Sequence, residues 1–297
     1  MVKRYGATAA LAGVSVTIGR GVTGLLGANG AGKTTLLGLL LGLDRPDAGR
    51  LSVLGLDPST AGAEVRALVG YSPEHRAVPP DTTAYDLVAH LAAVHGLPKR
   101  AAATRASDAL WHVGLGEERI RQIVTMSTGQ VQRVKIAAAL AHDPKLLLLD
   151  EPTDGLDPTQ RDDLLALIRR IGADYGIDVV LSSHVLDEVE RVCDAVVILG
   201  EGRLLAAGPL DQLRASVGGW VLEVDDGTEQ LAAALRAQGL TVVPDGLRLV
   251  VEGTDDASVL RDAVAAGGLG LVRLQRRRLS LEDVMLSGGL YDRTATP

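Results

Sequence analysis

The chain has 297 residues, with 30 lysines and arginines against 37 aspartates and glutamates, for a formal net charge of −7. This length predicts two domains of about 150 residues, or one large domain with an appendage. Hydrophobic residues make up 46% of the chain and charged residues 23%, which indicates a soluble globular protein and excludes a disordered one. The acidic balance and the five dispersed lysines argue against a nucleic-acid partner, because nucleic-acid binding needs a basic face.

Cysteine usage and apolar patterning indicate the compartment. The one cysteine, Cys193, excludes an internal disulfide framework and a multi-cysteine metal site, so nothing points to an oxidising environment. The densest apolar stretch, residues 36–43, is far shorter than the roughly 18 residues that cross a bilayer, and the first residues lack the apolar core of a signal peptide. We therefore expect a cytoplasmic protein that does not itself span a membrane.

The first 215 residues predict an α/β domain. Helical patterns alternate with four apolar runs that indicate buried strands, at residues 22–26, 145–150, 178–182 and 195–199. This alternation favours a parallel sheet with crossover helices. Because residues 81–142 are mostly helical in pattern, we expect a helical insert at about residues 75–142 within the domain 1–215.

The pattern changes from residue 218, and we expect a second, smaller domain at residues 218–297. The expected order of elements is β-α-β-β-α-β, which is that of ferredoxin-like α+β domains. Strands are expected at residues 220–224, 240–243, 247–251 and 269–274, and helices at residues 228–237 and 255–265. A last helix is expected to begin near Ser280, where Asp283 completes a capping box.

A glycine-rich segment at residues 27–34, GANGAGKT, predicts a phosphate-binding loop. It follows the expected strand 22–26 and precedes a leucine-rich helix, which is the context that this motif needs. Glycines let backbone N–H groups point at phosphate oxygens, and the helix N-terminus adds partial positive charge. In this motif Lys33 lies against the β- and γ-phosphates, and Thr34 offers its hydroxyl to Mg²⁺. The loop alone predicts a nucleoside triphosphate site without indicating the reaction.

Two carboxylates, Asp150 and Glu151, end the apolar run that begins at residue 145. On a parallel strand buried on both faces they reach the C-terminal edge of the sheet, where ligands of open α/β folds bind. We expect Asp150 to hold Mg²⁺ through water. We expect Glu151 to polarise a water for in-line attack on the γ-phosphate.

Five further segments accompany the loop and the acidic pair: Tyr5, residues 70–74 (GYSPE), residues 126–130 (MSTGQ), residues 155–158 (GLDP) and Ser183-His184. Over about residues 3–215, these motifs and their order resemble those of the ATP-binding subunit of an ABC transporter. In that family they correspond to the adenine-stacking aromatic residue, the Q-loop, the signature, the D-loop and the switch histidine. The resemblance implies a P-loop NTPase, RecA-like fold, with ATP and Mg²⁺ as cofactors.

The resemblance also implies roles for individual residues. Glu151 and His184 are the expected catalytic residues, with His184 donating a hydrogen bond to the γ-phosphate. Ser127 and Gly129 offer a hydroxyl and a backbone N–H to the γ-phosphate that the facing subunit holds. The implied metal ligands are Thr34, Glu74 and Asp150. The implied nucleotide-binding residues are Tyr5, Asn29, Gly30, Ala31, Gly32, Lys33, Thr34, Thr35, Glu74, Ser127, Gly129, Gln130 and Asp157.

Three departures from the family pattern bear on these expectations. Glu74 replaces the usual glutamine, which keeps an oxygen ligand for Mg²⁺ but adds negative charge near the phosphates. Met126 and Thr128 replace the usual leucine and glycine of the signature. Only four residues precede Tyr5, so we expect either that the sheet has lost the strand found there in the family or that the start lies upstream.

The implied function is ATP hydrolysis coupled to transport. The resemblance implies two copies paired head to tail around two ATP molecules, a separate membrane permease, and a location on the cytoplasmic face of the membrane. Residues 151–158 (EPTDGLDP), Glu74 and the C-terminal extension are similar to those of bacterial exporters of drugs, lipids or polysaccharides. Two alternatives remain: a soluble ABC ATPase acting on ribosomes or DNA, and a non-hydrolytic ATP-dependent clamp, against which Glu151 and His184 argue.

Overall fold

The structure, a computed structural model, describes residues 1–75, 78–215, 219–246 and 248–277. The chain divides into two compact units: the first comprises Met1–Leu210, and the second begins at Asp211. Across these described ranges, no helix is both long enough and apolar enough to cross a membrane.

A six-stranded sheet, in the order β4-β5-β6-β3-β7-β8, forms the centre of the first unit. Strands β3 to β7 run parallel as expected, and β8 pairs antiparallel with β7 at the edge. Neither the parallel strand β4 nor the antiparallel strand β8 was predicted. The bounds are β3 Val22–Leu26, β4 Val69–Ser72, β5 Leu146–Leu149, β6 Asp178–Ser183, β7 Ala195–Gly200 and β8 Arg203–Pro209.

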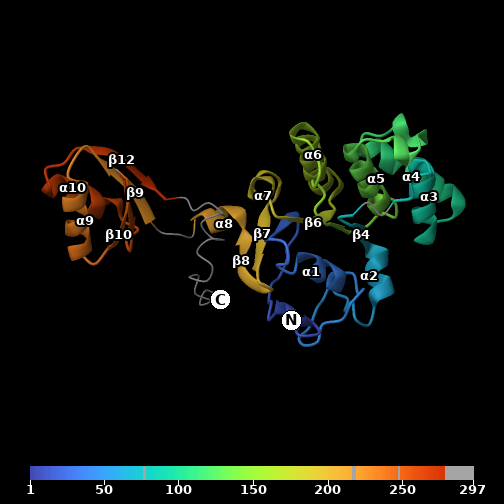
Figure 1. The fold of residues 1–297 in the computed structure, drawn as a ribbon, viewed down its shortest axis with the longest axis horizontal. Coiled ribbons are helices and arrows are strands. Elements are labelled where there is room, and N and C mark those ends of the chain that lie inside the picture. The colour runs from blue at the N-terminus through green and yellow to red at the C-terminus, as the bar shows by residue number, and fades with distance from the viewer. Residues whose placement is uncertain (76–77, 216–218, 247, 278–297) are drawn as a thin grey trace. The chain divides into compact units, whose positions relative to one another are not determined.

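Helices cover both faces of this sheet, which explains why its central strands are almost fully buried. Helix α1 (Lys33–Leu40) packs four leucines against one face, and α6 (Pro158–Tyr175) and α7 (Leu186–Val192) lie on the other (Figure 1). The approach of α7 is close: a Cβ on Gly24 of β3 would lie 2.5 Å from a methyl group of Val189. All five residues of β3 are buried, so this strand ends at a rigid point of the fold.

The expected helical insert consists of three helices grouped beside β4 (Figure 1). They are α3 (Ala84–Val94), α4 (Lys99–His112) and α5 (Thr128–Leu140), and α2 (Gly62–Leu68) precedes β4. Two 3₁₀ turns, Glu118–Ile120 and Ile123–Thr125, join α4 to α5. The Thr83 side chain accepts a hydrogen bond from the Asp86 N–H at 3.0 Å and so caps α3.

The N-terminal residues form an antiparallel hairpin. Strand β1 (Val2–Tyr5) pairs with β2 (Thr8–Ala12), and Gly6 in the turn has a φ of 60°. The Val2 N–H also donates to the Ala48 carbonyl oxygen at 2.8 Å. Of the two alternatives, the loss of this strand is not observed, because the turn at Gly6 lets residues 2–5 pair with β2.

The second unit has the expected β-α-β-β-α-β order. Its four strands pair antiparallel in the order β10-β11-β9-β12, and α9 and α10 pack on one face around Leu222, Leu249 and Leu260. The bounds are β9 Gly219–Val224, α9 Thr228–Ala237, β10 Thr241–Asp245, β11 Arg248–Glu252, α10 Ala257–Ala266 and β12 Leu271–Arg276, preceded by α8 Leu210–Ala215. The helix expected from Ser280 lies outside the described residues.

Candidate functional site

The loop predicted to bind phosphate runs from the end of β3 into α1. Side chains are excluded at two of its glycines: an added Cβ would lie 2.5 Å from the Leu199 carbonyl oxygen at Gly27 and 2.6 Å from the Ala10 carbonyl oxygen at Gly32. Gly32, with a φ of 102°, is the N-cap of α1 and provides no side-chain cap. The first N–H groups of α1 therefore remain available to an anion.

The remaining loop residues surround this helix end. Ala31 is buried, and its carbonyl oxygen accepts a hydrogen bond from the Gly202 N–H at 3.2 Å, which ties the loop to the turn between β7 and β8. Asn29, Gly30 and Thr34 are exposed, and Thr35 is half-buried. The loop thus has a fixed backbone and an open outer side, as a phosphate-binding loop requires.

Lys33 extends back over this loop, with its side chain only 6% exposed. Its ammonium donates to the Gly27 carbonyl oxygen at 2.6 Å and to the Ala28 carbonyl oxygen at 3.3 Å. It also forms an ion pair with Glu151, whose Oε1 is 3.1 Å away. A positive charge is therefore held at the centre of the loop.

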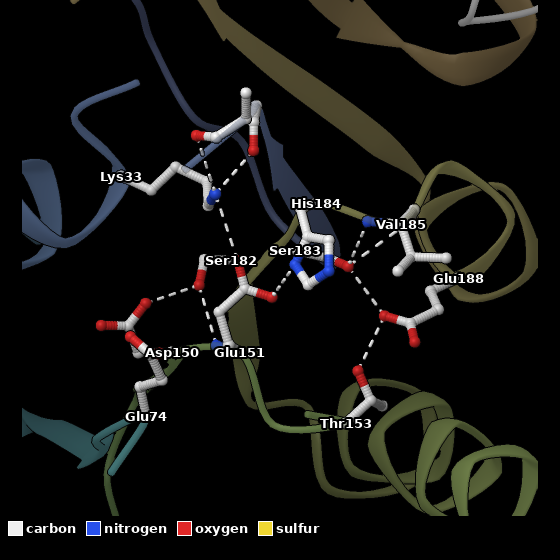
Figure 2. A network of polar contacts seen from close by, with 12 residues as sticks. Lys33, Glu74, Asp150, Glu151, Thr153, Ser182, Ser183, His184, Val185 and Glu188 are labelled. Atoms are coloured by element: carbon white, nitrogen blue, oxygen red, sulfur yellow. Dashed lines mark hydrogen bonds and ion pairs between the residues drawn. The ribbon is translucent and has the colours of Figure 1, made fainter. Parts of the chain in front are cut away.

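Glu151, directly after β5, connects Lys33 to His184. Its Oε2 lies 2.9 Å from Nδ1 of His184, which follows β6 (Figure 2). The backbone of Glu151 has a φ of 45°, an uncommon left-handed conformation for a residue other than glycine. Its N–H is held by the Ser182 hydroxyl oxygen at 2.9 Å, and that hydroxyl donates to Asp150 at 2.6 Å. These contacts aim the Glu151 carboxylate at the loop.

The two expected carboxylate ligands of Mg²⁺ come from neighbouring parallel strands. Asp150 follows β5 and Glu74 follows β4, so both lie at the C-terminal edge of the sheet, and Figure 2 shows them near each other. Burial, together with the charge of Asp150, raises the pKa of Tyr71 to about 12 and keeps that neighbour neutral. No group of three His, Cys, Asp or Glu side chains that could ligate a metal occurs among the described residues. The carboxylates of Asp150 and Glu74 are oxygen donors of the kind that Mg²⁺ takes beside phosphate oxygens and water.

The signature residues lie at a different place from the phosphate-binding loop. Ser127 is the N-cap of α5 and forms a capping box with Gln130: its hydroxyl accepts from the Gln130 N–H at 3.2 Å, and the Gln130 side chain accepts from the Ser127 N–H at 3.1 Å. A Cβ on Gly129 would lie 2.9 Å from the Gln160 side chain, and Asp157 caps α6 by accepting from the Gln160 N–H. In the part of the chain that the structure describes, neither Ser127 nor Gln130 hydrogen-bonds to the loop.

Tyr5, at the end of β1, has a ring that is 52% exposed. Its hydroxyl donates to Asp44 at 2.6 Å, which raises the pKa of Tyr5. The Lys3 ammonium lies 5.1 Å from the ring centre and 2.5 Å from Asp44. One face of the ring is thus braced by polar contacts near the loop.

Three functional candidates were not anticipated from the sequence: Ser182, Thr153 and Glu188. Ser182 bridges Asp150 to the Glu151 backbone, while Glu188 on α7 accepts hydrogen bonds from Thr153 and from Ser183. The available signal was a pair of serines inside a buried apolar strand and an acid in the first turn of α7. Cys193 is buried, and burial raises the pKa of its thiol to about 12.

Known proteins share both the sequence and the fold. A family model described as ABC transporter matches residues 11–154. The chain is 32% identical to the linearmycin resistance ATP-binding protein LnrL of Bacillus subtilis (strain 168), over 96% of this chain and 95% of that protein. It is 35% identical to the daunorubicin resistance ATP-binding protein DrrA3 of Streptomyces coeruleorubidus, over 96% and 92%.

A solved structure gives the same result for the fold. The chain superposes with a TM-score of 0.62 and 25% identity on a dimeric ATP-binding cassette in a post-hydrolysis state bound to ADP and Pi, covering 70% of this chain and 95% of that one. The expected P-loop NTPase fold is confirmed. The chain is 32% identical to LnrL over nearly its whole length, and Lys33 of its loop contacts Glu151, which in turn contacts His184. It therefore belongs to the ABC transporter family as one of its ATP-binding, ATP-hydrolysing subunits.

Proposed function

We propose that the chain binds ATP with Mg²⁺ between two head-to-tail copies, and that hydrolysis resets this closed dimer to drive export through a separate membrane permease. The observation that carries the proposal is the continuous chain of contacts from Lys33 to Glu151 to His184, at 3.1 Å and 2.9 Å. It joins the phosphate-binding loop to a base and to a second proton-carrying group, which are the parts that phosphoryl transfer to water needs.

Each residue of this chain has a separate role in the proposal. The Lys33 ammonium and the N–H groups of residues 29–35 bind the β- and γ-phosphates. Since Lys33 pairs with Glu151, a γ-phosphate that takes the ammonium leaves the Glu151 carboxylate free to accept a proton from the attacking water. His184, half-exposed beside Glu151, donates a hydrogen bond to the γ-phosphate and orients that water.

The oxygen donors at the sheet edge fit a magnesium ion. Thr34, Asp150 and Glu74 would hold it together with phosphate oxygens and water, with Asp150 acting through water. When bound, the ion would supply positive charge that offsets the negative charge of the phosphates. Tyr5 supports adenine with its exposed face.

The proposed dimer explains why Ser127 and Gly129 lie apart from the phosphate-binding loop of their own copy. Ser127 is exposed at the N-terminus of the 13-residue helix α5, and the partial positive charge of this helix end favours an anion. In the proposed assembly, Ser127, Gly129, Gln130 and the D-loop residue Asp157 meet the γ-phosphate that the facing copy holds. The dimeric cassette that this chain resembles supports such a pairing.

Export and a membrane partner are supported by the relatives. Both LnrL and DrrA3 are named as drug-resistance ATP-binding proteins. We infer a permease on a separate chain, contacted through residues 74–95, and a location on the cytoplasmic face of the membrane. A soluble ATPase acting on ribosomes or DNA and a non-hydrolytic clamp are the alternatives. The clamp is disfavoured by the hydrogen bond between Glu151 and His184, since a protein that only binds ATP needs no such pair.

The Glu151→Gln variant tests the catalytic part. It removes the base but keeps its shape, so ATP binding and ATP-dependent dimerisation measured by light scattering are expected to persist while turnover falls by a factor of about 100 or more. Glu117→Gln, an exposed glutamate of the helical insert, is the control and keeps full turnover. Hydrolysis by Glu151→Gln at the parental rate contradicts the base assignment.

Affinity capture of the tagged Glu151→Gln chain with ATP, from detergent-solubilised membranes of its host, tests the transport part. Recovery of a polytopic membrane protein in stoichiometric amounts is the expected result. Recovery of ribosomes or DNA instead favours the soluble alternative.

A further inference from the structure

Glu188, on α7, is a buried carboxylate that the proposed hydrolysis does not use. The residue is only 2% exposed. Its Oε2 accepts hydrogen bonds from the Thr153 hydroxyl at 2.8 Å and from the Ser183 hydroxyl at 2.7 Å (Figure 2). Its Oε1 lies 3.3 Å from Nε of Arg161, on α6. One carboxylate oxygen thus joins two segments that are far apart in sequence.

These two segments carry the two ends of the contact between Glu151 and His184. Thr153 lies in the turn after Glu151, which is closed by a hydrogen bond from the Asp154 N–H to the Glu151 carbonyl oxygen at 3.2 Å. Ser183 directly precedes His184, and its hydroxyl oxygen also accepts from the Val185 N–H at 3.0 Å, so the chain turns around His184. The Glu188 carboxylate therefore connects the turn after Glu151 to the turn around His184.

The position of α7 in the fold does not explain why this acid is buried. A charged residue is unfavourable in the interior unless it is paired, and an apolar residue packs there without that penalty. An acid in the first turn of a helix is favourable because of the helix dipole, but Asp187 already provides one, with a side chain that is 78% exposed. The partners of Glu188 account for a carboxylate at this place, because one oxygen accepts from two hydroxyls and the other pairs with the Arg161 guanidinium.

We propose that Glu188 is a positioning residue for ATP hydrolysis, which holds the turn after Glu151 and the turn around His184 in one arrangement. The proposal rests on the function proposed above. Glu188 acts through Thr153 and Ser183 and does not touch the nucleotide. Its effect belongs to the chemical step, because the phosphate-binding loop makes none of its three contacts.

The Glu188→Gln variant in the full chain, with Asp187→Asn on the same helix as the matched control, tests this role. Glutamine keeps the shape but loses the charge that Arg161 balances, so the two turns loosen. We expect kcat for ATP to fall at least about tenfold in Glu188→Gln, because small misplacements of catalytic groups have large effects. KM, nucleotide binding and the melting temperature are expected to stay near the parental values, and Asp187→Asn is expected to change none of these. An unchanged kcat, or a fall in binding or melting temperature that parallels it, overturns the proposal.

Coupling between Thr153 and Ser183 is the second measurement. Thr153→Val and Ser183→Ala each remove one hydroxyl, and the double variant is expected to lose less kcat than the product of the two single losses, because both act through Glu188. Thr153→Ser, which keeps the hydroxyl, is expected to keep most of the activity. Independent losses, or a loss in Thr153→Ser as large as in Thr153→Val, overturn the shared role.

Hydrogen–deuterium exchange separates this proposal from the proposed function, since it needs no turnover. Glu188→Gln is expected to speed exchange at the Asp154 and Val185 amides, which close the two turns, and Asp187→Asn is expected to leave it unchanged. Unchanged exchange in Glu188→Gln overturns the positioning role whether or not the parent hydrolyses ATP. If exchange is faster in Glu188→Gln but the parent chain hydrolyses no ATP, the proposed function is rejected and the structural link between the two turns is retained.

Discussion

Lys33 and Glu151 bury opposite charges against each other, with side chains that are 6% and 8% exposed. Such a pair adds little net stability, because both ions have lost their water, but removing one partner leaves an uncompensated buried charge. Lys33→Met is therefore expected to lower the free energy of unfolding by about 3 kcal/mol, measured by urea denaturation without nucleotide. Adding Glu151→Gln is expected to recover much of this loss. A double variant whose loss equals the sum of the single losses contradicts the pairing.

Single residues differ in how well a sequence predicts them. Lys33, Glu151 and His184 were predicted because each stands at a fixed place in a motif next to a strand end. The bonds of Glu188 to Ser183 and of Ser182 to Asp150 are set by the pairing of β5, β6 and α7, and a lone polar residue inside an apolar or helical pattern does not indicate such a partner. The contact of Tyr5 with Asp44 spans 39 residues and has no local signal either.

At the scale of elements, the Ser127 side chain at the N-terminus of α5 has two roles. The Ser127 hydroxyl caps the helix, and the proposed function also places it on a phosphate. Ser127→Ala is expected to lower the free energy of unfolding by about 1 kcal/mol, because the cap is lost. Ser127→Asp keeps the cap and the stability, but its charge repels phosphate, so turnover is expected to fall at least about tenfold.

Thr83→Asp, the same kind of change at the cap of α3, is the control for this comparison and is expected to keep both stability and turnover. Full ATPase activity in Ser127→Asp would mean that this hydroxyl does not meet a phosphate in any assembly of the chain.

Two other element ends make the helical insert sensitive to acid. His95 follows α3 and His142 follows α5, and their rings stack with centres 3.8 Å apart. Burial and the neighbouring His95 lower the pKa of His142 to about 4. As pH falls from about 6.5 to about 4, His142 is protonated in the unfolded chain but stays neutral in the folded chain. The folded state therefore loses stability across that interval.

Urea denaturation at pH 7 and pH 5 measures this effect. We expect a loss of roughly 1 kcal/mol on acidification, reduced because the ring is only partly buried, and a smaller loss in His142→Gln. His90→Gln, an exposed histidine of α3, is the control and keeps the parental pH dependence. An equal pH dependence in His142→Gln contradicts the assignment.

Elements were predicted where their apolar pattern is set by burial on both faces. β3 and β6 pack between two helical layers, so each has an apolar run, and their expected positions agree with the structure to within one residue. The hairpin of β1 and β2 and the edge strand β8 were missed, because they are mostly half-buried or exposed and lack regular alternation. Strand β4 was also missed, because its four residues, VGYS, are too few to show an apolar pattern. Antiparallel pairing at an edge depends on turns such as that at Gly6, and the pattern of hydrophobic residues does little to predict it.

At the scale of the whole molecule, the chain contains separate apolar cores. One is formed by α1 and the central sheet around Leu25, Leu148 and Val197, and the other by the second unit around Leu222, Leu249 and Leu260. Because each core is closed within its own unit, calorimetry of the full chain is expected to show two unfolding transitions. ATP with Mg²⁺ at about 100 times its dissociation constant is expected to stabilise the first unit alone, by about 2.7 kcal/mol.

Leu249→Ala tests the same division from the other side. Leu249 is fully buried in the second core, so its truncation is expected to lower the other transition by about 2–5 kcal/mol and to leave the ATP-sensitive transition in place. Val243→Ala, on the neighbouring strand and 53% exposed, is the control with a small effect on both. A single transition that ATP and Leu249→Ala both shift would mean that the two cores unfold as one cooperative unit, and the second unit would then be a required part of the ATPase fold.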